Sequence, residues 1–269
     1  GIGDLTVSYN DKYLGYSLDL KGSEYYTIFI RNINTNKLIT EKIEETSGGI
    51  TFSLDDKFIF YSKLDDESLP YKDHTYEYWT KTTAKGNYSI KLRKKSGTSK
   101  VEEIWNGDKE KEQLKTEYFG VGDLEVSNND KYLGYSLDLK GSEYYTIYIR
   151  DIKTNKIISR KITESSGGIT FSLDDKFIFY SKLDKNHRAR KIYRHEIGNY
   201  EDEDKLIFEE RSEAFTVSIG LSSDEKYYFI NTSDHNTSEQ YYFNVNEAEP
   251  QPKLIMKRER GVLYSVSSW

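Results

Sequence analysis

Residues 167–184 read GGITFSLDDKFIFYSKLD, and residues 48–65 carry the same string without a change. Each copy has an apolar alternating run, a polar Ser-Leu-Asp-Asp-Lys segment and a second run rich in aromatic and β-branched residues. This order predicts a β-hairpin, because alternate residues of a strand lie on one face of a sheet. Ser and Asp suit the turn, since their short side chains bond to nearby backbone groups.

The turn of this hairpin is a repeated motif. Its outline is Ser, a variable residue, Asn or Asp, an acid, Lys and an aromatic residue, and it starts at Ser8, Ser53, Ser127, Ser172 and Ser222. The spacings between successive motifs are 45, 74, 45 and 50 residues. A period of roughly 40–50 residues with four strands per repeat is typical of propeller blades. The sequence therefore predicts an all-β propeller of four-stranded antiparallel blades, with about five to six blades in this chain.

Composition agrees with this fold class. The chain has 24 Tyr and 12 Phe but only 3 Pro, as expected for many short strands whose rings pack between sheets. It has no Cys, so disulfides, thiolate nucleophiles and Cys-based zinc sites are excluded. No apolar run is long enough to span a membrane, and we expect no membrane partner. The first residues show no signal-peptide pattern, and we expect the cytoplasm.

A long internal repeat decides the domain organisation. Residues 120–184 match residues 1–65 at a constant offset of 119, and most positions are identical. We interpret the match as a duplicated chain segment, because blades of one propeller usually share only their core pattern. We expect a single propeller domain over 1–269, in which 66–269 follow in blade order. The expected strands are 5–8, 13–18, 25–31, 38–43, 76–81, 88–93, 101–105, 191–196, 205–209, 226–232, 240–244 and 253–256.

Four further local expectations follow from the pattern. The hairpin 48–65 should begin a second unit, and 108–116 should form one helical turn. Residues 261–269 should start another strand. In the loop before the third strand, Ser23 and Glu24 are expected to be turn residues, with a ligand role as the alternative.

No stretch carries the pattern of a catalytic site. A hydrolase elbow needs Gly-x-Ser-x-Gly, and the nearest string, residues 220–224, has Asp224 at the second Gly position and falls in an expected turn. The Gly pairs 1–3 and 120–122 open expected strands rather than helices, so they offer no phosphate site. We predict no catalytic residue in this chain.

Metal and nucleic-acid sites are not predicted either. His74, His187, His195 and His235 lack metal-binding spacing, and the acidic run 201–204 lacks the pattern of a calcium loop, so a solvated hairpin loop is expected there. The formal net charge is −6, and we expect no nucleic-acid partner. The basic clusters are expected to be solvated faces; they lie at 91–95, 187–191 and 257–260. We expect no cofactor and no metal.

Several motifs in order resemble the N-terminal propeller of the oligopeptidase B (protease II) group, in the prolyl oligopeptidase family of serine peptidases. They are, by residue range, LPY at 69–71, YEYW at 76–79, EYF at 117–119, GDLEVS at 122–127, GSEYYT at 141–146, SGGI at 166–169, FY at 179–180, FTVSIG at 215–220, TSE at 237–239 and GVLYSV at 261–266.

The resemblance implies seven blades followed by an α/β-hydrolase domain that cuts after basic residues, with the propeller limiting access to short peptides. Residues 1–65 resemble a middle portion of that propeller but precede the part that should come first, so the chain resembles a rearranged, truncated relative. We expect a non-catalytic gating portion, with short basic peptides or a separate hydrolase domain as partners.

Two alternatives stay open: a stand-alone peptide- or protein-binding propeller, and a relic without function. Open blade edges are expected to favour self-association. As a hypothesis, residues 1–65 pack beside the last blade and partly complete the ring.

Overall fold

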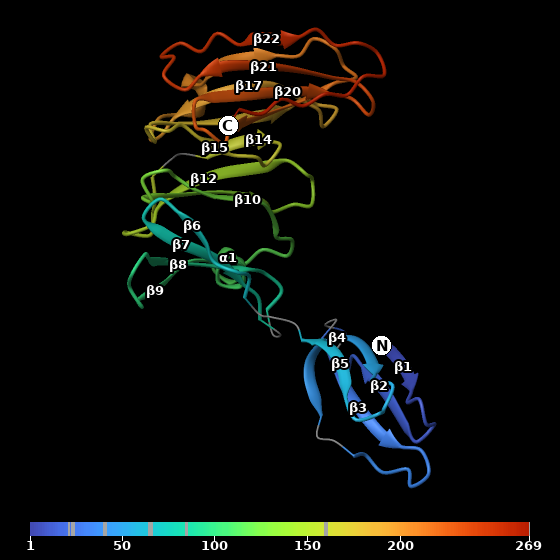
Figure 1. Cartoon of the computed structure of the whole chain (residues 1–269). Coiled ribbons are helices and arrows are strands. Elements are labelled where there is room, and N and C mark those ends of the chain that lie inside the picture. Colours follow the sequence, from blue (N-terminus) through green and yellow to red (C-terminus); the bar gives the residue numbers. More distant parts are fainter. Residues whose placement is uncertain are drawn as a thin grey trace. The chain divides into compact units, whose positions relative to one another are not determined.

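The computed structural model describes residues 1–20, 22, 25–39, 42–63, 67–83, 86–158 and 161–268 (Figure 1). The chain divides into two compact units: residues 1–71, 78–93 and 105–108 form the first, and residues 72–77, 94–104 and 109–269 form the second. Ser23 and Glu24, expected to be turn residues, lie outside the described residues.

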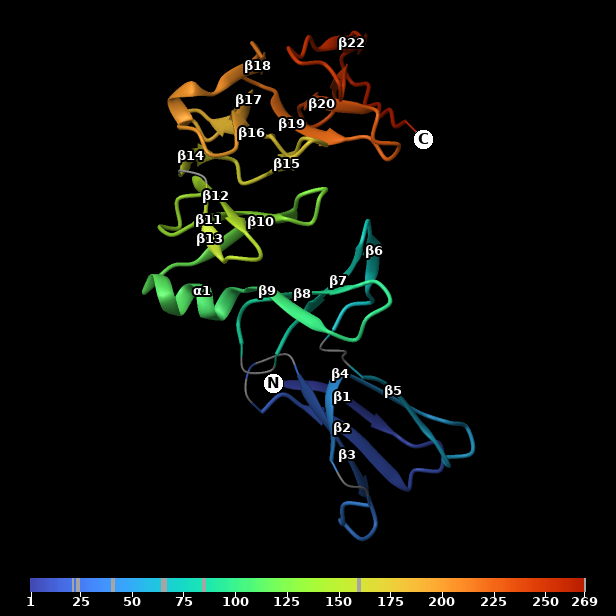
Figure 2. The ribbon, with the colours of Figure 1, turned by 90° about the vertical axis from the view of Figure 1, so that its left-hand side faces the viewer.

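The segment 1–65 contains one five-stranded antiparallel sheet in the order β1-β2-β3-β4-β5 (Figure 2). The expected strand 38–43 is wrong, because β4 begins at Ile43, and Leu38 makes only an isolated bridge with Arg31. β4 then continues to Phe52, so the hairpin 48–65 extends the first sheet instead of beginning a second unit. The strands are β1 (Ile2–Val7), β2 (Tyr13–Leu18), β3 (Tyr26–Asn32), β4 (Ile43–Phe52) and β5 (Ile59–Lys63).

The next sheet has four strands in the order β6-β7-β8-β9. These are β6 (Tyr71–Asp73), β7 (Tyr76–Lys81), β8 (Ile90–Lys95) and β9 (Val101–Asn106). The following helix, α1 (Gly107–Leu114), is longer than the single turn that the sequence predicts.

Residues 120–209 form one nine-stranded sheet with the main path β10-β11-β12-β14-β16-β17-β18. The part with β10 to β14 and the part with β15 to β18 are joined by a single residue pair, Ser165 with Lys182. Each part therefore corresponds to one blade. The strands are β10 (Gly120–Val126), β11 (Tyr132–Asp138), β12 (Tyr145–Asp151), β13 (Lys156–Ile157), β14 (Ile162–Ser165), β15 (Thr170–Phe171), β16 (Phe177–Leu183), β17 (Ala189–Glu196) and β18 (Lys205–Glu209).

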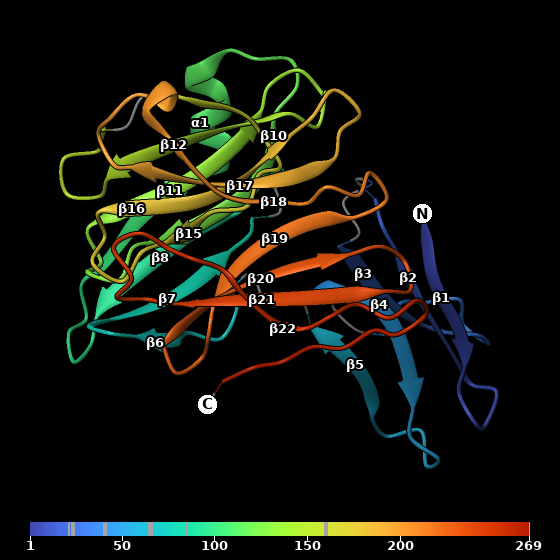
Figure 3. The same ribbon diagram turned by 90° about the horizontal axis from the view of Figure 1, so that it is seen from above.

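The last sheet has the order β19-β20-β21-β22, and its strands run side by side in Figure 3. They are β19 (Thr216–Leu221), β20 (Tyr227–Ser233), β21 (Ser238–Asn244) and β22 (Lys253–Met256). The strand expected at 261–269 is wrong over its described part, since 261–268 form no strand. That segment is fastened by Ser238, whose Oγ accepts from the Tyr264 N–H at 2.8 Å and donates to the Tyr264 carbonyl at 2.9 Å.

The repeated turn has one geometry in all five places. In the 172 copy, the Ser172 Oγ donates to Asp174 Oδ1 at 2.7 Å and accepts from the Phe177 N–H at 2.9 Å. The residue after the bonded Asn or Asp is left-handed, as at Asp175 with φ 54°, which short polar side chains tolerate better than most. The motif recurs because the Ser side chain at its first position closes the same backbone turn each time. The other four copies of the turn begin at Ser8, Ser53, Ser127 and Ser222.

Two apolar clusters make the core of 120–245. The first packs the aliphatic and aromatic side chains of β12, β14 and β16 together, including Ile147, Ile178 and Tyr180. The second joins Phe179 to Tyr228 and Phe243 of the last sheet. Since β16 alternates its side chains between the two clusters, one strand holds two neighbouring sheets together.

The fold class is confirmed: the described chain is a set of antiparallel, blade-like sheets of the propeller type. The single domain over 1–269 and the packing of 1–65 beside the last blade stay predictions.

Candidate functional site

A groove lies between β10 and β19, with a cavity volume of about 530 Å³. We call it the β10–β19 groove. It is lined by Asp123, Glu125, Ser166, Gly168, Ile169, Thr170, Tyr180, Ser181, Leu183, His187, Ala189 and residues 216–219. Two of these side chains are carboxylates, and none of the described lining residues is Lys or Arg. The groove is therefore suited to a cationic side chain.

The acidic wall of the groove is fixed by backbone contacts. The Asp123 carboxylate accepts from the N–H of Leu124 at 2.8 Å and from the N–H of Ile169 at 2.9 Å. Gly122 is required beside it, because a Cβ there would lie 2.6 Å from Ser136 Oγ and 2.8 Å from the Tyr145 ring. This explains the second Gly of the pair at 120–122, which opens strand β10 as expected.

The string 220–224 has the geometry of a turn and not of a nucleophile elbow. Ser222 is 6% exposed, and its Oγ donates to Asp224 Oδ1 at 2.8 Å while accepting from the N–H of Tyr227 at 3.0 Å. In the part of the chain that the structure describes, no His bonds to Ser222, and its role is that of the other four turn serines.

The four His lie apart, but one belongs to a buried polar group. His195 is fully buried, and its Nδ1 is 2.6 Å from Asp204 Oδ1. The Tyr180 hydroxyl donates to Asp204 Oδ2 at 2.8 Å. Burial first, and then the Asp204 carboxylate, raise the pKa of Tyr180 far above its ordinary value. The group fastens the 201–204 segment to β16 and β17.

The other three His occupy turns or loops. His74 Nδ1 lies 2.7 Å from Asp73, His187 packs on the Tyr144 ring at 4.2 Å, and His235 is exposed in the β20–β21 loop. Within the part of the chain that the structure describes, no three or more His, Asp or Glu side chains gather as a metal site.

The prediction of a solvated hairpin loop at 201–204 is partly wrong. Residues 201–203 form a 3₁₀ turn, and Glu201 accepts from the Lys182 ammonium at 2.7 Å and from the Thr163 hydroxyl at 3.1 Å. Asp204 is buried with His195, as described above. Two of the four acids therefore hold the loop against the sheet and are not simply solvated, because their partners arrive from strands distant in sequence.

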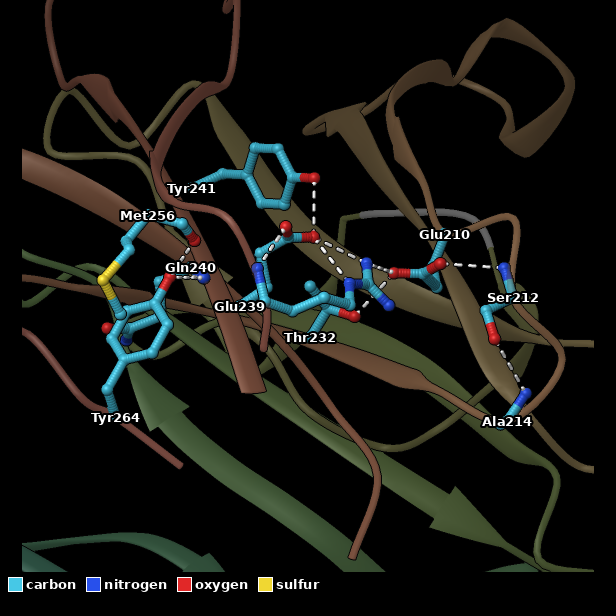
Figure 4. A network of polar contacts seen from close by, with 10 residues as sticks. Glu210, Ser212, Ala214, Thr232, Glu239, Gln240, Tyr241, Met256 and Tyr264 are labelled. Carbon is cyan, nitrogen blue, oxygen red and sulfur yellow. Dashed lines mark hydrogen bonds and ion pairs between the residues drawn. The ribbon is translucent and has the colours of Figure 1, made fainter. Parts of the chain in front are cut away.

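A second charged cluster lies in the last sheet, where Figure 4 shows Glu239, Glu210, Thr232 and Tyr241 around a common centre. The Arg258 guanidinium donates to Glu210 at 2.5 Å and to Glu239 at 2.6 Å. Both Glu side chains are buried, at 5% and 4% exposure. Arg258 also stacks over the Phe215 ring, 4.1 Å from its centre. The prediction that the basic cluster 257–260 forms a solvated face is therefore wrong for Arg258.

The two carboxylates titrate below their ordinary range. Burial is the largest single influence and raises the pKa of Glu210, but hydrogen bonds from Arg258, Ser212 and Thr232 together outweigh it and lower that pKa. The pKa of Glu239 is lowered in the same way by Arg258 and Tyr241 against burial. The cluster is a closed ionic lock, with its acids already bonded.

Sequence reasoning missed this lock because Glu210, Glu239 and Arg258 are far apart along the chain. The TSE string at 237–239 contains Glu239, but its sequence does not indicate that the partner is Arg258. Sequence reasoning also missed the ion pair between Arg150 and Glu110. The Arg150 guanidinium bonds both carboxylate oxygens of Glu110, at 2.7 and 2.8 Å, and so holds α1 against β12.

None of the helices in the described part of the chain has the length and apolar character of a membrane span.

Comparison with known proteins places these features in a family. The family model described as "Prolyl oligopeptidase, N-terminal beta-propeller domain" matches residues 1–68 and again 63–269. Protease 2 of Moraxella lacunata is 26% identical over 215 residues, which cover 79% of this chain and 29% of that protein. Dipeptidyl aminopeptidase BI of Pseudoxanthomonas mexicana is 24% identical over 246 residues, covering 86% of this chain and 34% of that protein.

Solved structures give the same fold. Oligopeptidase B from Leishmania major has a TM-score of 0.71 at 24% identity, and the match covers 76% of this chain and 29% of that one. Oligopeptidase B from Trypanosoma brucei, with covalently bound antipain, has a TM-score of 0.69 at 24% identity. The chain thus spans about a third of the length of the relatives it matches. With the family model matching throughout, the chain belongs to the prolyl oligopeptidase N-terminal β-propeller family.

Proposed function

We propose that this chain is the propeller portion of an oligopeptidase B-like serine peptidase. In this role it gates the access of short basic peptides to a hydrolase domain that lies outside these 269 residues. The observation that carries the proposal is the β10–β19 groove, whose charged wall consists of Asp123 and Glu125. Family membership supplies the context of a peptidase.

The physical argument rests on charge. A carboxylate near a cationic side chain at a partly solvated site contributes about 1 kcal/mol. Glu125 is exposed whereas Asp123 is half-buried, so Glu125 is the more accessible carboxylate for a basic peptide. The first copy offers a natural comparison, because Thr6 stands where the second copy has Glu125. The chain itself is proposed to be inactive, since its sequence contains no Gly-x-Ser-x-Gly elbow.

The test is hydrolysis of a fluorogenic Arg-Arg dipeptide amide by the purified chain, alone and mixed with a separately expressed hydrolase domain of a relative. We expect no cleavage by the chain alone and altered cleavage in the mixture. Replacing Glu125 by Thr should weaken the effect on the Arg-Arg substrate about fivefold and leave an uncharged substrate unaffected. Cleavage by the chain alone would overturn the non-catalytic role, and an unchanged mixture would contradict gating.

A second candidate function is a stand-alone propeller that binds a peptide or protein segment. The edge strand β5, which pairs only with β4 in the described sheet, favours it, because exposed sheet edges accept further strands, including those of another copy. This function needs no hydrolase domain, so binding measured with the chain alone separates the two candidates. The duplication of 1–65 and a cytoplasmic location are also part of the proposal. The near-identity of the two copies supports the duplication, and the lack of Cys is compatible with the reducing cytoplasm.

A further inference from the structure

The strand β5 is the last strand of its sheet, and it exposes large apolar side chains. Phe58 is 63% exposed, Phe60 62% and Tyr61 43%. We call residues 58–63 the β5 edge. Among the described residues, no strand pairs with β5 on its outer side. A sheet edge of this kind with aromatic side chains is a template for pairing with another strand, because its outer N–H and C=O groups can accept further ladder hydrogen bonds.

The same sequence occurs a second time in the chain, and there the structure shows what covers it. Strand β16 has the residues of the β5 edge at 177–182, and β17 pairs with it antiparallel, with Tyr180 opposite Tyr193 and Phe179 opposite Arg194. The Tyr193 ring stacks on Tyr180 with centroids 5.8 Å apart. The Arg194 guanidinium lies 4.5 Å from the centre of the Phe177 ring.

These contacts identify the chemistry that fits the β5 edge. Phe58 and Tyr61 correspond to Phe177 and Tyr180, so the edge offers one ring to a guanidinium and one to an aromatic side chain. The charge balance agrees: residues 1–65 contain ten acidic and seven basic residues, whereas residues 185–196 contain five Lys or Arg and a single acid. The covering strand and the sheet that would receive it are therefore electrostatically complementary.

We propose that the β5 edge binds an extended basic segment with the chemistry of β17, as an added antiparallel strand. The segment places an aromatic side chain on Tyr61 and an Arg on Phe58, while backbone hydrogen bonds to β5 supply the remaining affinity. This binding is independent of the proposed gating, because it uses residues 58–63 and not the β10–β19 groove, and it needs no hydrolase domain. It deepens the second candidate function by stating the chemistry of the segment that the β5 edge accepts.

The probe is a synthetic peptide with the sequence of residues 185–199, KNHRARKIYRHEIGN, added to the full chain. Amide hydrogen exchange detects the added strand. Because residues 48–65 and 167–184 give fragments of identical mass, the experiment uses the Leu54→Ala chain, which tags the first copy. Leu54 is 77% exposed in the turn of the hairpin, so this change leaves the edge intact.

We expect the peptide to slow exchange in residues 59–63 and not in 178–182, with one peptide bound per chain. A scrambled peptide of the same composition should not do so, since charge alone does not set the strand register. The variant Leu54→Ala/Phe58→Ala/Tyr61→Ala should bind the peptide about tenfold more weakly than Leu54→Ala. The replaced side chains are exposed, so the variant should fold.

Three results would overturn the proposal: unchanged exchange in 59–63 with peptide, equal protection by the scrambled peptide, or equal affinity of the two variants. Sedimentation velocity of the chain without peptide tests whether a second copy of the chain occupies the β5 edge instead. A concentration-dependent dimer that already protects 59–63 would assign the edge to a second copy of this chain and would also overturn the proposal.

Discussion

Residues 48–65 and 167–184 have the same sequence, yet the structure gives them different surroundings. Phe60 is 62% exposed, while its counterpart Phe179 is 3% exposed. Tyr61 is 43% exposed, while Tyr180 is 2% exposed. Both copies form the hairpin. The difference teaches that eighteen residues specify the hairpin locally, whereas burial of its outer strand depends on what the rest of the chain packs against it.

The chain downstream of each hairpin explains the difference. After the second copy the chain turns back as β17, and the sheet β19–β22 packs its Tyr228 and Phe243 against Phe179. After the first copy the chain enters the sheet β6–β9, so β5 remains an edge strand.

The largest expected difference is between Phe179→Ala and Phe60→Ala. Removing the buried ring should lower the free energy of unfolding of its unit by about 3–5 kcal/mol, because the change leaves a cavity between two sheets. The same change at Phe60 should cost less than about 1 kcal/mol. Urea denaturation followed by circular dichroism measures both. A similar cost at the two positions would contradict the difference in burial.

The second comparison uses the equivalent residues Arg150 and Arg31. The Arg150 side chain is 9% exposed, and its guanidinium bonds both oxygens of Glu110. Arg150→Ala should therefore cost about 3 kcal/mol, because it leaves a partly buried carboxylate without its cation. Arg31 bonds the Asn36 side chain at 2.7 Å near the surface, and Arg31→Ala should cost less than about 1 kcal/mol. Thermal unfolding of the two variants checks the ratio, and Glu110→Gln should reproduce most of the Arg150 effect.

The third prediction concerns the lock formed by Arg258, Glu210 and Glu239, which has no counterpart in the first copy. Both Glu have lowered pKa values in the folded state, so their stabilisation is present above the unfolded pKa of about 4.3 and is lost as the pH falls through the folded values. Wild-type stability should fall over this acidic range.

Arg258→Met removes the cation while keeping an apolar side chain over Phe215. Burial then acts on the two carboxylates without the Arg, so their pKa values should rise above the wild-type values. The variant should be about 3 kcal/mol less stable near neutral pH, and its difference from wild type should shrink on acidification. Urea unfolding at several pH values measures this, and a constant difference across the acidic range would count against the lock.

The smallest effect should be the same in both copies. Ser53 and Ser172 close their turns with equal bonds to Asp55 and Asp174, at 2.7 Å each. Ser→Ala at either position should cost about 1 kcal/mol, because the lost contacts are local to the turn. Stability measurements on Ser53→Ala and Ser172→Ala test this equality. A much larger cost at one site would show that the turn energy also depends on neighbouring sheets.

Sequence reasoning reached the local features of the fold and missed the non-local ones. Alternation predicted β7 and β22 to the residue, and the recurring Ser-Asx pattern predicted the five turns. It could not show that β4 is one continuous strand, because the corresponding residues 162–171, which differ at only two positions, form two separate strands, β14 and β15, in the second copy. The partners of Arg258 were equally hidden, since spacing along the chain does not report pairing between strands. For the β10–β19 groove, the family resemblance implied short basic peptides as partners, but the sequence did not identify Asp123 or Glu125 as the residues that would meet them.

The most direct test of the account is amide hydrogen exchange of the Leu54→Ala chain without any ligand, comparing residues 59–63 with residues 178–182. The account predicts that the first copy exchanges at least about tenfold faster, because β5 has a free edge and β16 lies between paired strands. Equal exchange in the two identical stretches would contradict it, since the β5 edge would then be covered as fully as β16.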